Sequence, residues 1–254
     1  MTERITRRSL LASGVLGAGG LMLAGCDKLN GAPSFRRLLE SAEDAHRASQ
    51  RLIGGGTLAP EFTLADMSPD FRSNGNRTGA GNALWDRHAA GGFADWKLRV
   101  DGLVLRPLDL SLEAMKAMPQ RTQITRHDCV EGWSAIGQWS GTQLGALLKA
   151  AGLLPAARFI VFHCADRFGD KPYYETIDLF DAFHPQTILA HTMNGAALPV
   201  DHGAPLRLRV ERQLGYKQAK YVMRIEARSS LAGLYGGKGG YWEDHADYAW
   251  YAGI

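Results

Sequence analysis

The apolar residues near the start of the chain are spaced for one long amphipathic helix. Between residues 35 and 53 they recur at three- and four-residue intervals, which is the period of an α-helix. Ser34 precedes this run as a candidate N-cap, and three glycines at 54–56 follow it as a stop signal. The next stretch, 54–95, is rich in Gly, Asn, Asp and Pro, which predicts mostly loop.

The rest of the chain carries short strand patterns and short helix patterns, which indicates an α+β domain of mixed sheets and short helices. Strands are predicted over 97–105, 158–163, 206–211 and 221–227, and helices over 111–118, 142–151 and 178–183. Apolar and polar residues alternate strictly in 206–211, so Arg207 and Arg209 are expected to point to the same face of a strand. We expect one domain over 70–254, preceded by a helix and loop over 26–69.

The first 25 residues have the pattern of a secretory signal, a basic start followed by a short apolar stretch. Arg7 and Arg8 stand within Thr-Arg-Arg-Ser-Leu-Leu, which resembles a twin-arginine export signal. The tetrapeptide Leu-Ala-Gly-Cys that ends at Cys26 resembles a lipobox, whose cysteine becomes the lipidated N-terminus. We therefore expect a periplasmic protein anchored to the membrane through Cys26. The alternative is ordinary Sec export, with Cys26 only a small residue near the cleavage site.

The composition of the 254-residue chain excludes several classes of protein. With 45% hydrophobic and 22% charged residues, the chain is neither disordered nor collagen-like. It has no run of about 18 apolar residues, which excludes a polytopic membrane protein. Its 29 basic and 26 acidic residues give a net charge of +3, too small for binding nucleic acid by charge alone. We expect a small-molecule substrate, no nucleic-acid partner, and membrane contact only through the lipid anchor.

Two cysteines remain after Cys26, and the residues alone leave two interpretations open. Cys129 and Cys164 could form a structural disulfide, since an exported protein meets an oxidising compartment. Alternatively, Cys129 could ligate a metal, because Arg126 and His127 stand next to it and positive charge favours the thiolate that binds soft metals. Zinc is disfavoured, because no Cys or His has the spacing that would complete its site.

A longer motif around Cys129 favours the metal. Cys129-Val-Glu-Gly-Trp-Ser, followed by Trp139-Ser-Gly, resembles the molybdenum-ligating segment of the sulfite oxidase superfamily, and is most similar to its periplasmic methionine sulfoxide reductase branch. The resemblance covers roughly residues 70–228. It continues in order through Tyr173-Tyr-Glu, Asp181-Ala-Phe-His-Pro-Gln-Thr, Asn194-Gly, Leu198-Pro, Gly203-Ala-Pro-Leu-Arg-Leu and Gly215-Tyr-Lys-Gln-Ala-Lys.

This resemblance implies a cofactor, Mo-molybdopterin, with one molybdenum per chain held by one pyranopterin dithiolene. Cys129 would be the only protein sulfur bound to the metal. Asn74 matches an asparagine that contacts the pterin, although Asn76 is close enough to compete for this role.

The resemblance also implies a grip on the phosphate of the pterin. Arg207 matches an arginine that holds this phosphate, and Lys220, with the backbone of Gln218 and Ala219, matches a phosphate-binding segment. The chemistry agrees, because a buried phosphate needs cationic or N–H donors and arginine binds it well.

The chain departs from the family pattern in two positions and in length. Cys164 replaces a threonine and His202 replaces an asparagine, and both positions line the cofactor in the relative, which puts the substrate in doubt. Sulfite oxidases carry a dimerisation domain and some a haem domain, whereas this chain ends at Ile254. We expect a bare molybdenum domain with no dimerisation domain. Its electron partner would be separate, either a membrane cytochrome b or a soluble cytochrome c.

The expected function is oxygen-atom transfer on a small S-oxo or related substrate, in the manner of a sulfoxide reductase. Cys129 would tune the metal, while Arg126 and Arg77 are candidates for attracting the substrate. One alternative is sulfite oxidation on the same fold, which a concentrated cationic pocket beside the metal would favour. A second is a non-catalytic lipoprotein with a Cys129–Cys164 disulfide.

The last part of the chain has no counterpart that we can assign. Residues 236–251 combine glycines with five aromatic residues, which predicts a packed lid over the core or over a substrate pocket.

Overall fold

The structure, a computed structural model, describes residues 32–254 in two units, one that ends at Gly55 and one of Gly56–Ile254. The predicted signal and Cys26 lie outside the described residues. The first unit is the predicted long helix, α2 (Pro33–Gly54), which ends where the glycines begin. Its N-cap is Ala32 and not Ser34, because Pro33 occupies the first helical position. Proline suits this position, since its φ is already helical and no N–H is needed there.

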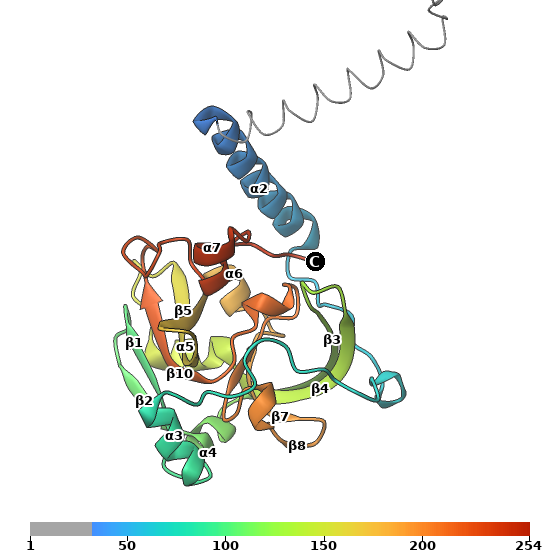
Figure 1. Cartoon of the computed structure of the whole chain (residues 1–254), viewed down its shortest axis with the longest axis vertical. Helices are drawn as coiled ribbons and strands as arrows, with labels where there is room; N and C mark the ends of the chain where they lie inside the picture. The colour runs from blue at the N-terminus through green and yellow to red at the C-terminus, as the bar shows by residue number, and fades with distance from the viewer. Residues whose placement is uncertain (1–31) are drawn as a thin grey trace, which may run out of the picture. The chain divides into compact units, whose positions relative to one another are not determined.

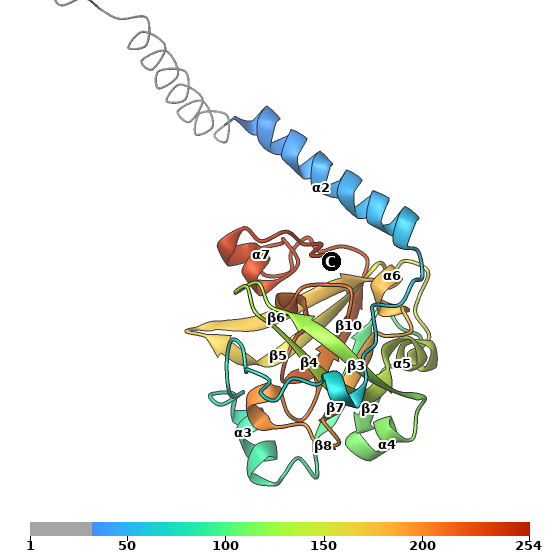
Figure 2. The same cartoon turned by 90° about the vertical axis from the view of Figure 1, so that its right-hand side faces the viewer.

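Two five-stranded sheets form the frame of the second unit (Figures 1 and 2). The first sheet has the order β2 (Leu108–Ser111), β1 (Lys97–Gly102), β10 (Val222–Arg228), β5 (Phe159–Phe168) and β6 (Lys171–Asp178). The second has the order β3 (Gln120–Asp128), β4 (Ser134–Gln143), β7 (Ile188–Met193) and β8 (Ala196–Ala197), with β9 (Arg207–Arg209) paired to β7. All pairs are antiparallel except β1 with β10.

Short helices connect these strands, and three of them stand where the sequence predicts helices. They are α3 (Ala83–Ala90), α4 (Leu112–Lys116), α5 (Leu144–Ala151), α6 (Leu179–Ala182) and α7 (Tyr241–Ala246), with 3-10 turns at Leu64–Asp66, Val200–His202 and Gly215–Lys217. The side chains of Ser111 and Asp178 accept backbone N–H bonds at the starts of α4 and α6, as N-caps do. Helix α3 lies in the stretch predicted as mostly loop, where Asn82 caps it.

Strand β3 shows why several strands escape a reading of hydrophobic pattern. Its inward-facing residues Gln123, Thr125 and His127 are all buried, yet all are polar. Buried and more exposed residues alternate along β3, but the buried ones are polar. A search for alternating apolar residues therefore finds no strand here. Their partners are Arg209 of β9, which bonds to Thr125 and His127, and Glu211, which accepts a bond from Gln123.

The main hydrophobic core lies between the first sheet and the helices α4 and α5. Met115 of α4 and Leu144, Leu147 and Leu148 of α5 are fully buried against residues of β1, β5 and β10. A smaller cluster surrounds Trp139 of β4, under the second sheet. The two clusters hold the sheets and therefore fix the loops between them.

Strand β9 confirms that Arg207 and Arg209 share one face. Both guanidinium groups stack on the ring of Trp139, at 4.8 and 4.4 Å from its centroid. This face is fully buried, which strict polar alternation does not indicate. Arg209 is compensated there, since it forms a 2.5 Å ion pair with Glu211 and a 3.0 Å hydrogen bond to Nδ1 of His127.

A second buried ionic group joins the C-terminal segment to the first sheet. The Lys217 ammonium donates to Glu175 of β6 and, at 2.6 Å, to Glu243 of α7, and all three side chains are fully buried. Burial and the nearby Glu243 charge raise the pKa of Glu175 well above its usual value. A protonated Glu175 would leave one carboxylate to balance one ammonium. A side chain at Gly240 would collide with Glu243, so this turn requires glycine.

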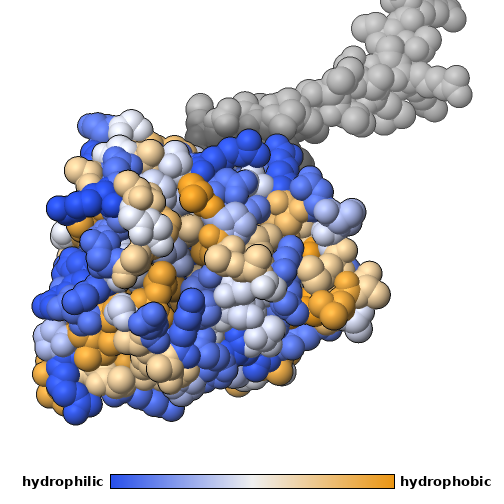
Figure 3. All heavy atoms as spheres, turned by 90° about the horizontal axis from the view of Figure 1, so that it is seen from below, coloured by the Kyte–Doolittle hydropathy of each residue, from blue (hydrophilic) through white to orange (hydrophobic). Residues whose placement is uncertain are grey.

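On the face shown in Figure 3, hydrophobic residues occur in small groups separated by hydrophilic ones. Such a mosaic is ordinary for a folded surface. Within residues 32–254 no helix has both the length and the apolar character needed to cross a membrane.

The buried lysine gives a first prediction. Lys217→Met should lower the free energy of unfolding by about 3–5 kcal/mol, because it leaves the buried acidic side chains of Glu175 and Glu243 without their cation. Urea denaturation at pH 7 measures this. The exposed Lys149→Met variant is the control and should change the value by less than about 0.5 kcal/mol. Equal stabilities of the two variants would contradict the role given to the ion group.

Candidate active site

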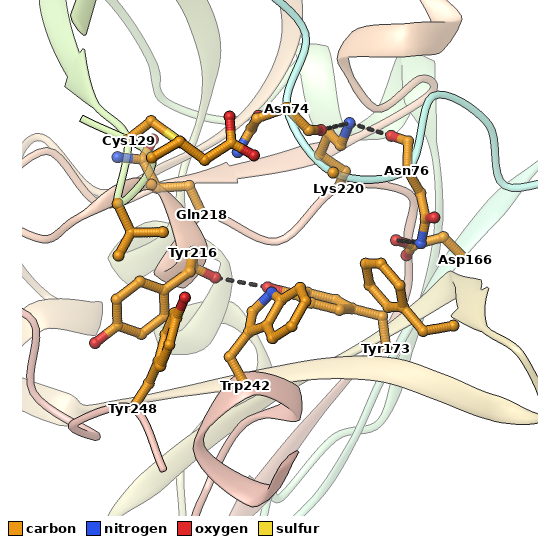
Figure 4. A pocket seen from close by; sticks show the side chains of 15 residues that line it. Asn74, Asn76, Cys129, Asp166, Tyr173, Tyr216, Gln218, Lys220, Trp242 and Tyr248 are labelled. Atoms are coloured by element: carbon orange, nitrogen blue, oxygen red, sulfur yellow. Dashed lines mark hydrogen bonds between the residues drawn. The ribbon is translucent and has the colours of Figure 1, made fainter. Parts of the chain in front are cut away.

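A cavity of about 150 Å³ lies where loops from both sheets meet (Figure 4). Its lining comes from segments far apart in the chain: residues 74–76, 129–131, 166–173, 215–220 and the C-terminal part from Trp242 to Tyr248. Cys129, Gln218, Asn74 and Lys220 form one side, and a row of aromatic rings faces them from the other (Figure 4).

Cys129 lies at the tip of the β3–β4 hairpin. The pairing of the two strands ends at Asp128 and Ser134, and the turn between them is closed by bonds from Cys129 N–H to Trp133 O (2.9 Å) and from Gly132 N–H to Cys129 O (3.0 Å). Gly132 has φ of +87°, which glycine adopts freely. The hairpin therefore carries a free thiol to the wall of the cavity.

The charge around Cys129 differs from the sequence-based expectation. Burial raises the pKa of its thiol, while Arg72 and the side chain of Asn74 act in the opposite direction. Arg126 does not line this cavity, because its guanidinium pairs with Asp128 at 2.9 Å and its side chain is more than half exposed. Arg77, the other candidate for attracting substrate, is also exposed and outside the lining.

Lys220 fixes the loop that carries both candidate asparagines. Its ammonium donates to the backbone carbonyls of Asn74 (2.7 Å), Asn76 and Asp201 (3.0 Å), which uses its three donors. Burial, with the charge of Arg207, lowers the pKa of Lys220 to about 7. Asn74 and Asn76 both line the cavity, so the structure does not separate them as candidates for a cofactor contact.

Two buried oxygens at the cavity have no hydrogen-bond partner. They are Oδ1 of Asp166 and Oε1 of Gln218, and both residues line the cavity. The other oxygen of Asp166 accepts a 3.0 Å bond from Asn76. Burial raises the pKa of Asp166 to about 6. An unpaired buried acceptor costs free energy. A ligand with N–H donors would form the missing hydrogen bonds and remove this cost.

Arg207 lies next to the cavity and not in its lining. Its guanidinium donates to the carbonyls of His202 (3.0 Å) and Gln218 (3.5 Å), and its Nε has no partner. No carboxylate pairs with it among residues 32–254, and burial, with the nearby Arg209, lowers its pKa to about 9. Ala219 is buried, and its carbonyl accepts a bond from Leu208 N–H.

The two departures from the family pattern also lie outside the cavity lining. Cys164 is buried on β5 opposite Val222 of β10, and burial raises the pKa of its thiol. It is a free cysteine, so the structure contains no Cys129–Cys164 disulfide. His202 packs edge-on against Phe71 with ring centroids 5.7 Å apart.

His127 lies against Gly215 and outside the cavity lining. It is fully buried, and burial together with Arg209 and Arg207 lowers its pKa well below the usual value, so it is neutral. A Cβ at Gly215 would lie 2.5 Å from Nε2 of His127, so the turn that carries the cavity residues 215–220 requires glycine to approach this closely.

Comparison with known proteins shows the family of this chain. Residues 88–232, more than half of the chain, match the family described as oxidoreductase molybdopterin binding domain. The chain belongs to this family. It is therefore a molybdopterin oxidoreductase with a sulfite-oxidase-like fold, as the resemblance implied.

Among similar proteins, a putative protein-methionine-sulfoxide reductase subunit YedZ1 of Azospira oryzae is 41% identical over 63% of this chain and 56% of its own length. The protein-methionine-sulfoxide reductase catalytic subunit MsrP of Campylobacter jejuni is 32% identical over 63% of this chain and 57% of its own. The chain thus spans little more than half the length of these relatives. The crystal structure of the sulfane dehydrogenase SoxCD from Paracoccus pantotrophus has a TM-score of 0.50 and 24% identity, covering 54% of this chain and 39% of that one, which is a likeness in fold.

The residues of this molybdopterin oxidoreductase fit the cofactor of its family. The cavity joins a thiol, a soft ligand, to unpaired acceptors that suit the N–H groups of a pterin ring. Arg207 supplies a buried Nε donor without a partner, which an anion could accept from. Among residues 32–254, no group of three or more His, Cys, Asp and Glu side chains is arranged to hold a metal ion.

Asp166 gives a prediction on pH. A folded-state pKa of about 6, above the ordinary 3.8, means that stability from its protonated form is complete below pH 4 and is lost as pH rises through 6. The difference corresponds to about 3 kcal/mol. Asp166→Asn should therefore gain about 3 kcal/mol relative to wild type between pH 4 and pH 7, measured by urea denaturation of cofactor-free protein. A difference that does not vary with pH would contradict this.

Proposed function

We propose that the protein is an exported molybdenum enzyme that transfers an oxygen atom from or to a small S-oxo substrate, in the manner of a sulfoxide reductase. The observation that carries this proposal is the free Cys129 thiol in one cavity with unpaired acceptors, beside a buried arginine without a carboxylate partner. The names of two relatives, each a methionine sulfoxide reductase subunit, support the substrate class.

Each residue near the cavity then has a role toward the cofactor. Cys129 would be the sulfur ligand of one molybdenum, and Asn74 and Gln218 would bond to the pterin. Arg207 would hold the phosphate, since its Nε is buried and unpaired. Lys220 would add positive charge while it holds the loop at 74–76. When bound, the group supplies two-electron oxygen-atom transfer.

The protein itself would position the substrate and hold a proton. Reduction of a sulfoxide, R₂SO + 2H⁺ + 2e⁻ → R₂S + H₂O, consumes two protons. Asp166, with a pKa of about 6 and a partnerless Oδ1 at the cavity, can hold a proton near neutral pH. The aromatic side of the cavity offers a substrate an apolar surface.

The electrons would come from a separate protein, because the names of the relatives describe a subunit and a catalytic subunit. A membrane cytochrome b or a soluble cytochrome c are the candidates. The export signal in residues 1–25 and the lipobox that ends at Cys26 support a periplasmic enzyme on a lipid anchor.

The cavity does not favour sulfite as substrate. Its lining contains one cation, Lys220, beside two acids, Glu131 and Asp166. An oxyanion site would concentrate positive charge, and neither Arg126 nor Arg77 contributes it here.

Replacement of the metal ligand is the direct test. Cys129→Ser should lower turnover at least about 100-fold with an artificial electron donor, because serine oxygen is a harder ligand than thiolate. Cys164→Ser is the matched control and should keep turnover, with some loss of stability. Near-normal turnover in Cys129→Ser would remove this residue from the metal, whatever the control shows.

The phosphate assignment is tested by metal content. Arg207→Ala should lower cofactor affinity by roughly two to three orders of magnitude, since loss of a partner to a buried anion costs about 3–5 kcal/mol. Molybdenum per chain is measured in purified folded protein, with Arg228→Ala on β10 as control. Arg209 cannot serve as control, because its removal would strand the buried Glu211. Full molybdenum content in Arg207→Ala would show that the phosphate is held elsewhere.

A further inference from the structure

The cavity has two chemically different sides (Figure 4). One side carries Cys129 and the polar groups already assigned to the cofactor. The other consists of Tyr173, Tyr216, Trp242 and Tyr248, which we call the aromatic wall. Its residues contact one another. The hydroxyl of Tyr173 donates to the backbone carbonyl of Tyr216 at 2.6 Å, and the rings of Tyr216 and Tyr248 meet edge-on with centroids 5.0 Å apart.

Half of the aromatic wall comes from a part of the chain that the family match does not cover. The match ends at residue 232, whereas Trp242 and Tyr248 belong to the C-terminal segment. Their rings stack with centroids 5.8 Å apart and planes 25° apart. Asp247 has φ of +53° and ends helix α7, and this turn brings Tyr248 back beside Trp242.

The C-terminal segment is held rigidly in this position. Glu243, next to Trp242, is fixed by the buried ammonium of Lys217. Asp244 accepts a bond from the hydroxyl of Tyr174 and 2.9 Å bonds from the backbone N–H groups of Gly236 and Lys238. A wall anchored to the first sheet in this way is preorganised, so a ligand that contacts it does not lose affinity in ordering it.

We propose that Trp242 and Tyr248 determine substrate specificity by contacting the organic groups on the sulfur of a neutral sulfoxide. This inference rests on the proposed function. Aromatic faces are negative, so they disfavour an oxyanion such as sulfite, whereas they pack well against methyl groups and polarisable sulfur. The two rings face the side of the cavity that carries Cys129, which is where the sulfur of a substrate has to arrive (Figure 4).

Variants of the two wall residues, Trp242 and Tyr248, test this proposal. In molybdenum-loaded enzyme, Tyr248→Leu and Trp242→Leu should each raise KM for methionine sulfoxide and dimethyl sulfoxide roughly tenfold, the lower end of what a hydrophobic contact contributes to discrimination. kcat should stay within about twofold, and molybdenum per chain should not change. Tyr235→Leu is the matched control, because Tyr235 lies in the same part of the chain, is 52% exposed and does not line the cavity.

Two outcomes would overturn the proposal while leaving the proposed function intact. One is a loss of molybdenum in Trp242→Leu and Tyr248→Leu but not in Tyr235→Leu, which would place the wall against the cofactor. The other is a fall in kcat with unchanged KM. Melting temperatures of all variants identify a change caused by unfolding, and in that case Trp242→Phe, which keeps an aromatic ring, should restore KM if the contact is direct.

A measurement of sulfoxide binding distinguishes failure of this inference from failure of the proposed function. The dissociation constant of dimethyl sulfoxide is measured by calorimetry on the loaded wild type and variants, without turnover. If the wild type binds the sulfoxide and the two wall variants bind it roughly tenfold more weakly, the wall has the role proposed here even if no sulfoxide is turned over. If all bind it equally, the inference is wrong, although sulfoxide turnover would still support the proposed function.

Discussion

Burial of positive charge without a matching carboxylate is the constraint on which this molecule depends. Arg207 and Lys220 are buried within one region, and no acidic side chain pairs with either among the described residues. Their pKa values fall to about 9 and about 7 because burial penalises the charged forms. Stacking on Trp139 and bonds to backbone carbonyls stabilise these cations only in part. A bound anion would supply the remaining stabilisation of these two cations. Without the anion, the surrounding protein has to be stable enough to keep them buried.

The other buried cations show how that stability is achieved. Arg209 is paired with Glu211, and Lys217 with Glu175 and Glu243, so each is compensated within the protein. The first pair joins β9 to the polar inner face of β3 through His127. The second joins β6, the turn at 215–217 and α7. Compensated charges therefore join the elements around the cavity, and the uncompensated Arg207 and Lys220 are the candidates for binding an anion.

Much of the fold could be predicted where local physics decides it. The short helices predicted over 111–118 and 178–183, and the alternation around Arg207, rest on neighbours along the chain, and they appear in the structure. Strand β3 could not be found in this way, because its buried residues are polar and their partners come from β9, more than 80 residues away. Arg126 shows conversely that nearness along the chain does not decide nearness to the cavity. It is a neighbour of Cys129 in sequence, but its side chain turns to Asp128 and away from the cavity.

In the candidate site, too, some residues could be predicted from the sequence and others could not. Cys129, Asn74, Gln218 and Lys220 could be named from a family motif, and the structure brings all four to one cavity. Asp166 and Tyr216 could not be singled out, because nothing in their local sequence distinguishes a buried unpaired carboxylate or a wall of the cavity from ordinary core residues. Both roles depend on segments that are distant in the chain and meet in the fold. A pattern of neighbouring residues does not show such contacts.

The separation of the cavity into two sides has a consequence for how the family can vary. The side proposed to hold the cofactor is built from residues within or near the family match, and in that proposal its thiol and its buried charge are required. The two positions that depart from the relative, Cys164 and His202, do not line the cavity, so they do not by themselves reshape the space that a substrate enters. Trp242 and Tyr248 do line it, and they lie beyond the match. Under the proposed function, a change in Trp242 or Tyr248 that leaves the ionic group of Lys217, Glu175 and Glu243 intact would alter selectivity while the cofactor side keeps its residues.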